Sequence, residues 1–386
     1  MQTDHLLQVL DNIQAAPPAP GESAHALGLA FDFQDLAGRF TIDTGTDFLY
    51  GESVNSLADA DPQSTSPSSL GDKGGSVTSR DFFHSFNAAQ RILHERAALG
   101  DLWKLREAFG NRSTHHSTVV RQVVDAIIRR ALERKAHLKD EVKASDGDKE
   151  TYLEHLIQSM SDPTQLRDQT LNILIALRDT TSSTLTSSMY ILAKHPAIFS
   201  QLRAHVLDVF GDDASREISA DDIKGATYMR AFLDEILRMF PPVPFNLRHT
   251  VNDVILPDVN GKMWYVPKNH DFSYASYLTH RRKDLWGDDA DNFDPERWLD
   301  DRRKRIDACP SMFHPFHLGP RLCLGQQFAY QEATFALVRL LQKYDTVELA
   351  TDKQPRDSYF DGEILPVAAV TLVWKGGMHI RLAKAT

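Results

Sequence analysis

Residues 316–325 read Phe-His-Leu-Gly-Pro-Arg-Leu-Cys-Leu-Gly, and this run contains Cys323, one of the two cysteines of the chain. Glycine and proline allow a tight bend before the cysteine, and a helical pattern follows the last glycine. Backbone N–H groups at the start of that helix can point at the sulfur and favour its thiolate form. The run therefore predicts a cysteine held in place as a metal ligand. The alternative is a buried structural cysteine, the usual fate of a single free thiol.

The pattern Phe-x-x-Gly-x-Arg-x-Cys-x-Gly in this run resembles the cysteine-ligand loop of the cytochrome P450 family, in which the thiolate binds haem iron. The resemblance implies that the cofactor is haem and that Cys323 is the metal ligand. It also implies that Phe316 covers the thiolate, and that Arg321 pairs with a haem propionate because a guanidinium matches a carboxylate in shape. Gly325 belongs to the same implied cofactor site.

A long helix is predicted from about Pro163 to the His195-Pro196 pair, with Asp179, Thr180 and a second threonine in its middle. An acid beside two threonines is locally unfavourable in a helix, since these side chains compete for backbone groups. The segment resembles the oxygen-activation motif of the P450 family. That resemblance implies that Asp179 relays protons from solvent and that Thr180 hydrogen-bonds dioxygen. The alternative is a helix surface whose hydroxyls bond back to the backbone.

One position departs from the family motif, because Leu177 follows Ala176 where the family has a glycine. Ala176 is implied to face the substrate. A glycine would let the helix widen and admit oxygen and water, so we expect the leucine to stiffen that groove or intrude on it.

A charged group is predicted from two further segments. Glu235 and Arg238 lie three residues apart before a double proline, so they share a helix face and can pair. Such pairs alone usually lie on a helix surface and contribute little to stability. Together with Arg297, however, they resemble in order and spacing the buried triad of the P450 family, which holds the cysteine loop in place. The triad is structural, and a buried charged network is costly to break.

Extended segments follow the double proline. Residues 243–248 are predicted to form a strand, and the resemblance implies that Arg248 reaches a haem propionate while Pro244, Phe245 and Asn246 face the substrate. An exposed strand charge is the alternative for Arg248. Near the C-terminus, residues 370–374 and 378–382 are predicted to form a hairpin, and the resemblance implies that its turn dips toward the substrate. The alternative is a simple surface hairpin.

Composition restricts the class of protein. The chain has 386 residues, 42% of them hydrophobic and 25% charged, with a net charge of −10. A globular core is expected, and a nucleic-acid partner is excluded because no basic surface is apparent. Cys309 and Cys323 form no disulfide framework, so we expect an intracellular, reducing location. Full-length relatives in the resembled family are anchored to the endoplasmic reticulum, and this chain shows no apolar run long enough for such an anchor.

The expected fold is mainly α with small β-sheets, and residues 1–386 are expected to form one cytochrome P450 catalytic domain. Two helices are predicted around a proline break at 17–20, followed by a loop over 59–79 and long helices over 81–110 and 112–139. The resemblance begins within the family domain, so an N-terminally truncated version is expected, lacking the anchor and the first helices and sheet.

The function implied by the resemblance is a haem-thiolate monooxygenase that hydroxylates a C–H bond of a hydrophobic small molecule with dioxygen. No flavin or nicotinamide motif is apparent, so the implied electron donor is a separate NADPH-cytochrome reductase. The motifs look most like fungal members that oxidise long-chain alkanes and fatty acids. Two alternatives stay open: a catalytically inactive truncated fragment, and a non-enzymatic haem-binding protein. The sixteen histidines show no metal-site spacing, and His314 and His317 are expected to be loop hydrogen-bonders.

Overall fold

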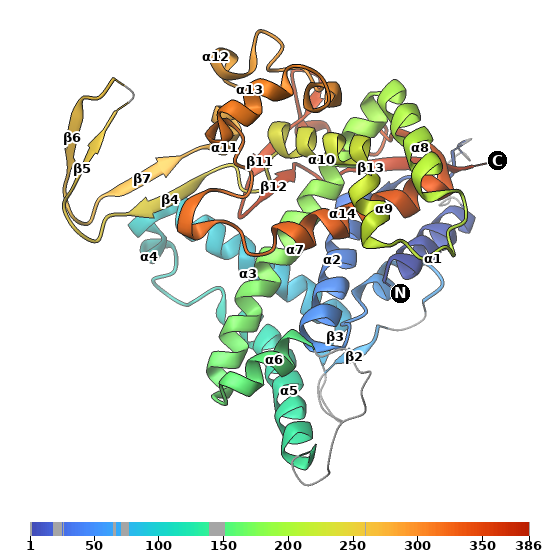
Figure 1. The fold of residues 1–386 in the computed structure, drawn as a ribbon. Helices are drawn as coiled ribbons and strands as arrows, with labels where there is room; N and C mark the ends of the chain where they lie inside the picture. The colour runs from blue at the N-terminus through green and yellow to red at the C-terminus, as the bar shows by residue number, and fades with distance from the viewer. Residues whose placement is uncertain are drawn as a thin grey trace.

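The computed structural model describes residues 2–17, 25, 27–64, 67–70, 77–138, 151–258 and 260–385. The fold is mainly helical with small antiparallel sheets, as predicted (Figure 1). The helices are α1 (Gln2–Ala15), α2 (Phe33–Tyr50), α3 (Ser79–Leu99), α4 (Trp103–Arg106), α5 (Thr114–Leu138), α6 (Tyr152–Ser159), α7 (Pro163–Lys194), α8 (Pro196–Phe210), α9 (Ala220–Gly225), α10 (Thr227–Met239), α11 (Ser276–Thr279), α12 (Lys283–Trp286), α13 (Arg303–Ala308) and α14 (Gln326–Lys343). The strands are β1 (Phe31–Asp32), β2 (Ser69–Leu70), β3 (Val77–Thr78), β4 (Asn246–His249), β5 (Val254–Pro257), β6 (Met263–Val266), β7 (Asp271–Tyr274), β8 (Tyr344–Leu349), β9 (Tyr359–Phe360), β10 (Glu363–Ile364), β11 (Pro366–Ala368), β12 (Leu372–Trp374) and β13 (His379–Lys384).

Helix α7 runs through the middle of the molecule, and α2, α5, α10 and α14 pack against it (Figure 1). The Asp162 side chain accepts a hydrogen bond from the Thr164 N–H, and Pro163 occupies the first turn, so the helix has a regular N-terminus. It ends at His195, before Pro196. The predicted helix from Pro163 to His195 is therefore confirmed.

The core is divided between the two halves of α7. One cluster packs the C-terminal half of α7 with α8, α10 and α14. A second cluster packs the N-terminal half with α2, α3, α5 and α6. The α7 residues between Ile175 and Leu185 belong to neither cluster. This middle segment contains the predicted oxygen-activation residues.

Helix boundaries elsewhere agree in part with the sequence. The two helices of residues 1–51 and the helix of residues 112–139 are present as α1, α2 and α5, although residues 18–20 of the proline break lie outside the described residues. The predicted helix over 81–110 is wrong beyond Leu99, because Gly100 adopts a positive φ of 52° and ends it. The predicted loop over 59–79 contains the short β2–β3 pair.

The predicted C-terminal hairpin is also wrong. Strand β12 pairs with β11, whereas β13 pairs with β8 and β1 in another sheet. The turn between them lies against Asp32, whose carboxylate accepts a hydrogen bond from the Met378 N–H at 2.9 Å. Gly377, with a φ of 86°, passes so close to that carboxylate that a side chain would collide with it. This contact directs the chain into the second sheet.

Among the described residues, no helix combines the length and apolarity needed to cross a lipid bilayer.

Candidate active site

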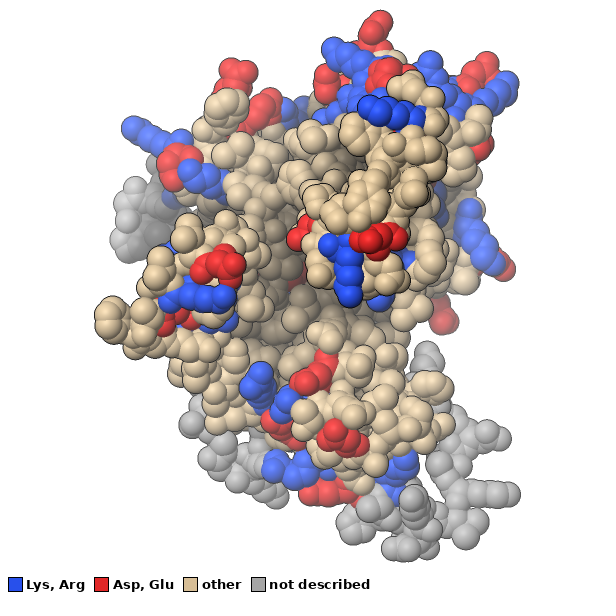
Figure 2. All heavy atoms as spheres, turned by 90° about the vertical axis from the view of Figure 1, so that its left-hand side faces the viewer, with Lys and Arg blue, Asp and Glu red and all other residues tan. Residues whose placement is uncertain are grey.

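A cavity of about 500 Å³ lies between the middle of α7 and the start of α14. Ligand pockets typically measure ~300–1,000 Å³. Figure 2 shows a hollow in one face of the molecule, with mainly uncharged residues inside it and charged side chains around it. The cavity lining is mostly apolar and includes Phe48, Ile173, Ala176, Leu177, Leu237, Val243, Phe316, Leu324, Phe328 and Ala333. The site therefore suits a large hydrophobic ligand.

The cysteine loop forms one wall of this cavity. Gly319 has a φ of 73°, which favours glycine, and the Cys323 N–H donates to the Phe316 carbonyl oxygen at 3.0 Å. Cys323 is exposed on the cavity side, directly before the N-terminus of α14. Phe316 also lines the cavity, and its ring lies 5.3 Å from that of Tyr330. Cys323 therefore lies at the positive end of the α14 helix dipole.

Gly325 caps α14 with a φ of −87°, which other residues adopt readily. A Cβ atom at this position would lie 4.0 Å from the Cys323 sulfur, which is an ordinary van der Waals contact, so the described residues leave room for a side chain here. Arg321 lies in the same loop and is exposed.

The opposite wall comes from α7, where Ala176, Thr180 and Thr184 follow one another at helical spacing and line the cavity. The Thr180 hydroxyl donates to the Ala176 carbonyl oxygen at 2.7 Å. Asp179 is buried and lies outside the lining. Its Oδ1 accepts from Arg178 Nη1 at 2.6 Å, and Arg178 Nε donates to the Gly38 carbonyl oxygen at 3.2 Å. Thr180 thus faces the cavity, whereas Asp179 is paired with Arg178, which reaches α2.

Leu177 also lines the cavity, and its side chain packs against Gly45 of α2. A Cβ atom on Gly45 would lie 3.0 Å from Leu177 Cδ2 and 3.0 Å from Leu174 Cδ1. The leucine that replaces the family glycine therefore occupies space that a glycine on the neighbouring helix leaves open.

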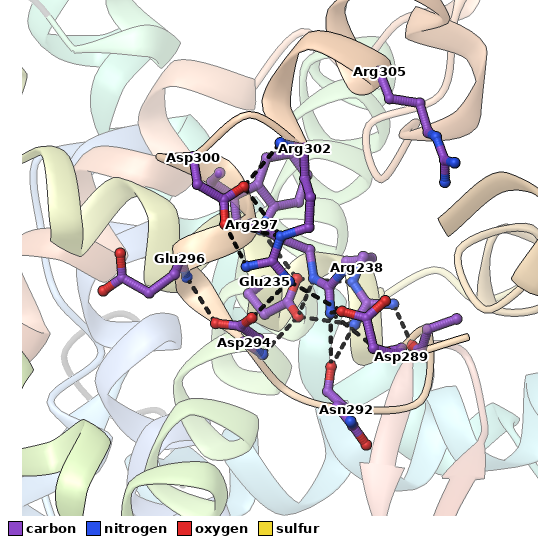
Figure 3. Close-up of polar contacts among 12 residues, drawn as sticks. Glu235, Arg238, Asp289, Asn292, Asp294, Glu296, Arg297, Asp300, Arg302 and Arg305 are labelled. Atoms are coloured by element: carbon purple, nitrogen blue, oxygen red, sulfur yellow. Dashed lines mark hydrogen bonds and ion pairs between the residues drawn. The ribbon is translucent and has the colours of Figure 1, made fainter. Parts of the chain in front are cut away.

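Glu235, Arg238 and Arg297 come together in one buried network (Figure 3). Arg238 donates to both carboxylate oxygens of Glu235 at 2.8 Å, and Arg297 Nε donates to Glu235 Oε1 at 2.9 Å. The Trp298 indole and the Asp294 N–H also donate to Glu235, at 3.0 and 2.9 Å. Each carboxylate oxygen is thus well satisfied, as a buried charge requires.

The network reaches the cysteine loop through His280. Arg238 Nη1 donates to the His280 carbonyl oxygen at 2.8 Å, and the His314 N–H donates to His280 Nε2 at 3.0 Å. Burial lowers the pKa of His280 to about 3, so this imidazole stays neutral and can accept that bond. A continuous chain of hydrogen bonds therefore links α10 to the segment that leads into Phe316.

Strand β4 lies at the edge of the site. Pro244 is buried, Phe245 is exposed and Asn246 is half-buried, and the cavity lining includes none of the three. Arg248 lies over the Tyr274 ring at 5.3 Å and donates to the Leu247 carbonyl oxygen. The lining at this edge comes from Pro242 and Val243.

His317 connects β4 to the cysteine loop, as expected of a loop hydrogen-bonder. The Leu247 N–H donates to Asn246 Oδ1 at 2.7 Å, so the Asn246 amide nitrogen faces His317 Nε2, 3.0 Å away. His317 Nε2 must therefore accept a hydrogen bond from this amide. The Nδ1–H group of His317 is then left to donate to the Tyr274 hydroxyl at 3.3 Å. His314 is likewise a hydrogen-bonder, with Nδ1 at 2.9 Å from the Ser311 carbonyl oxygen.

Two aromatic residues of the site were not predicted from the sequence. Phe48 and Phe328 line the cavity with their ring centroids 4.8 Å apart, although they belong to α2 and α14. Only the packing of distant helices brings them together, so local spacing carries no signal for them.

The residues present fit a haem group. An exposed cysteine at a helix N-terminus supplies the type of ligand that haem iron takes, and the apolar walls suit the macrocycle. A hydroxyl on α7, that of Thr180, lies across the same cavity.

Comparison with known proteins gives a consistent assignment. The sequence pattern of the family described as Cytochrome P450 matches residues 7–369. The chain is 35% identical to Cytochrome P450 52A6 of Candida tropicalis, over 84% of this chain and 61% of that protein. It is 36% identical to a cytochrome P450 of Arthroderma benhamiae, over 84% of this chain and 62% of that protein. It is 35% identical to Cytochrome P450 52A13 of Debaryomyces hansenii, over 89% of this chain and 65% of that protein.

The chain thus spans about three-fifths of the length of the curated relatives it matches. Members of the family carry haem iron on a cysteine thiolate, and Cys323 occupies that position in the loop pattern. The fold, the cysteine loop and these matches agree, and the chain belongs to the cytochrome P450 family.

Proposed function

We propose that this chain is a haem-thiolate monooxygenase that inserts one oxygen atom of dioxygen into a C–H bond of a hydrophobic substrate. A separate NADPH-cytochrome reductase supplies the electrons. The observation that carries the proposal is the cavity itself, where Cys323 and Thr180 line opposite walls of an otherwise mostly apolar space. In this proposal residues 1–386 act as one catalytic domain.

The chain's own residues have distinct roles in this proposal. Cys323 holds the iron of haem, which when bound supplies the centre that activates dioxygen. Phe316 and Gly325 shape the surroundings of the sulfur. Arg321 and Arg248 are the guanidinium partners proposed for the haem carboxylates, which requires Arg248 to leave the Tyr274 ring.

On the opposite wall, the Thr180 hydroxyl is placed to donate a hydrogen bond into the cavity if it leaves the Ala176 carbonyl oxygen. Asp179 is proposed to relay protons from a position outside the cavity lining, and Arg178 fixes its orientation. The buried group of Glu235, Arg238 and Arg297 is proposed to hold the cysteine loop through His280.

The proposed substrate is a long-chain alkane or fatty acid. Ala176 and the neighbouring apolar side chains offer dispersion contacts and few hydrogen-bonding groups, which suits an alkyl chain. Pro244, Phe245 and Asn246 are proposed to contact the substrate at the β4 edge of the site, beyond the cavity lining.

The test is a spectrum of the purified chain after haem loading, reduction and addition of carbon monoxide. We expect an absorption band typical of thiolate-ligated haem. Cys323→Ala should abolish it, and Cys309→Ala, a change at the other cysteine, should leave it intact. A band typical of histidine-ligated haem would contradict the assignment of Cys323.

The two alternatives give different results. A chain that takes up no haem is an inactive fragment. A chain with a thiolate-type spectrum that forms no hydroxylated product with reductase, NADPH and dioxygen is a non-enzymatic haem-binding protein. Fatty acids and alkanes of graded length should change the spin state of the haem if the proposed substrate class is right.

A further inference from the structure

Tyr330 is a buried tyrosine that joins the cysteine loop to α10. It lies on α14 and lines the cavity together with Cys323 and Phe316. Its ring packs against the Phe316 ring, with the centroids 5.3 Å apart and the planes inclined by 50°. Its hydroxyl donates to Asp234 Oδ1 on α10 at 2.5 Å. One side chain therefore contacts both the loop that carries the cysteine and a separate helix.

An ion pair holds this tyrosine in place. Both carboxylate oxygens of Asp234 lie 3.1 Å from Arg230 Nε, and the Arg230 guanidinium lies over the Tyr330 ring, 3.7 Å from its centroid. A cation over the face of an aromatic ring is attracted to it. Asp234 is only 4% exposed, whereas half of the Arg230 side chain is exposed. The guanidinium therefore covers the ring from the protein surface while the buried carboxylate binds its hydroxyl.

The Tyr330 hydroxyl is the donor in its bond to Asp234. Burial and the neighbouring carboxylate raise the pKa of the Tyr330 phenol well above its usual range. The phenol therefore keeps its proton, and the hydrogen bond to a charged acceptor is of the stronger kind.

Phe316 connects Tyr330 to the cysteine. The Phe316 carbonyl oxygen accepts the Cys323 N–H at 3.0 Å, so a shift of Phe316 moves the backbone that carries the sulfur. Helix α10 already holds the segment before the loop, through Arg238 and His280. Tyr330 holds the segment after it. The loop is thus attached to α10 on both sides of the cysteine.

We propose that Tyr330 is a positioning residue that holds Phe316 beside the Cys323 sulfur and thereby sets the reduction potential of the bound haem iron. Asp234 and Arg230 act through Tyr330. The inference rests on the proposed function, because it requires haem at Cys323. The potential of such a centre depends on the hydrogen bonds, burial and solvent access around its ligand.

The direction of the effect follows from charge. Reduction adds one electron, and therefore one negative charge, to the iron and its ligands. Water near the sulfur stabilises that added charge better than aromatic rings do, because charges are poorly solvated in apolar surroundings. Release of Phe316 should consequently admit water, raise the potential and favour the ferrous form.

The first test is hydrogen–deuterium exchange of the full chain without haem, measured over residues 316–325. Tyr330→Phe keeps the ring but removes the bond to Asp234, so we expect the Cys323 amide to exchange about tenfold faster. Tyr344→Phe is the matched control, because the Tyr344 hydroxyl is buried and has no hydrogen-bond partner among the described residues. Unchanged exchange in Tyr330→Phe would refute the positioning role, whether or not the chain binds haem.

The second test measures the reduction potential of the haem-loaded chain by titration with dithionite. We expect Tyr330→Phe to shift the equilibrium toward the ferrous form about threefold, and Tyr330→Ala about tenfold, which is ~59 mV for one electron. Tyr344→Phe should leave the potential unchanged. A loss of stability alone does not move the potential of the chains that stay folded, so this measurement separates positioning from a purely structural role. If Tyr330→Ala does not fold, Tyr330→Phe decides.

A double-mutant cycle tests whether Asp234 acts through Tyr330. Asp234→Ala removes the acceptor of the Tyr330 hydroxyl, so adding Tyr330→Phe to it should change the equilibrium by less than about twofold. Shifts that add in full would show that Asp234 acts by its charge alone, and would overturn its role in holding the ring.

The outcomes distinguish this inference from the proposed function. A wild-type chain without a thiolate-type haem spectrum contradicts the proposed function and this inference with it. A chain that has that spectrum, but whose potential is the same in Tyr330→Phe as in the wild type, contradicts this inference alone.

Discussion

Two buried glutamates in this molecule have opposite surroundings. Glu235 on α10 accepts hydrogen bonds from Arg238, Arg297, the Trp298 indole and the Asp294 backbone. Glu332 on α14 has no hydrogen-bond partner among the described residues. The first carboxyl is paired with two arginines. The second is left as a neutral acid.

The difference shows how one side-chain type takes two roles. The contacts of Glu235 lie away from the cavity, and its partners fix the backbone of residues 280–294, which leads to the cysteine loop. Glu332 fixes little, since its neighbours are two threonine side chains. A fully satisfied polar network makes a region rigid, whereas an unsatisfied buried group carries a desolvation cost that no hydrogen bond offsets.

The largest expected effect comes from a change at Glu235, the glutamate whose oxygens are fully hydrogen-bonded. Glu235→Gln leaves two buried guanidinium groups without their counter-charge, and losing one partner of a buried pair typically costs ~3–5 kcal/mol. We expect a loss of that size in the free energy of unfolding, measured by urea denaturation. Glu133→Gln, at an exposed position of α5, should change it by less than ~0.5 kcal/mol. A loss below about 1 kcal/mol for Glu235→Gln would show that the network is not structural.

The effect expected for Glu332 is small at low pH and grows as the pH rises. Its pKa in the folded chain is about 8, above the ordinary value of 4.5, so it contributes stability that is fully present below pH 4.5 and lost as pH rises to about 8. Glu332→Gln should remove this loss. The wild type should therefore fall relative to the variant by up to ~1.4 kcal/mol per pH unit across that window. Parallel stability curves would mean that the carboxyl is not protonated in the folded chain.

The sequence predicted the features that local spacing encodes. The cysteine loop, the long helix α7 and the three-residue step from Glu235 to Arg238 are all contained in short segments. The pairing of β13 with β8 and β1 could not be predicted in this way, because strand partners are chosen by tertiary packing. The surroundings of Glu332 depend on three helices that meet only in the folded chain.

Arg248 illustrates a related difference. The resemblance to the family implies a contact of Arg248 with the cofactor, whereas in the structure its guanidinium lies on Tyr274 of the neighbouring strand. The sequence identifies the side chain but does not fix its rotamer, since an arginine has several of similar energy and selects among them by contacts in three dimensions.

The smallest expected effect concerns the packing beside Glu332. Gly45→Ala improves helix propensity by ~1 kcal/mol, but the new methyl group lies 3.0 Å from Leu174 and Leu177 side-chain atoms. Overpacking of this kind costs ~1–3 kcal/mol, so we expect a net loss of about 1 kcal/mol in the free energy of unfolding. Leu177→Ala frees part of the space and should reduce that loss, with a coupling of at least ~0.5 kcal/mol in a double-mutant cycle.

The same variant distinguishes the two glutamates. Thr44, which precedes Gly45, lies beside Glu332, so a displacement of α2 should change the pH slope of stability that Glu332 produces. Glu235 shares no hydrogen-bond partner with Gly45, so the cost of Glu235→Gln should be the same with and without Gly45→Ala, to within ~0.5 kcal/mol. Additivity at both glutamates would mean that α2 does not enclose Glu332. Coupling at both would mean that α7 transmits packing changes to α10, and that the two sites are not independent.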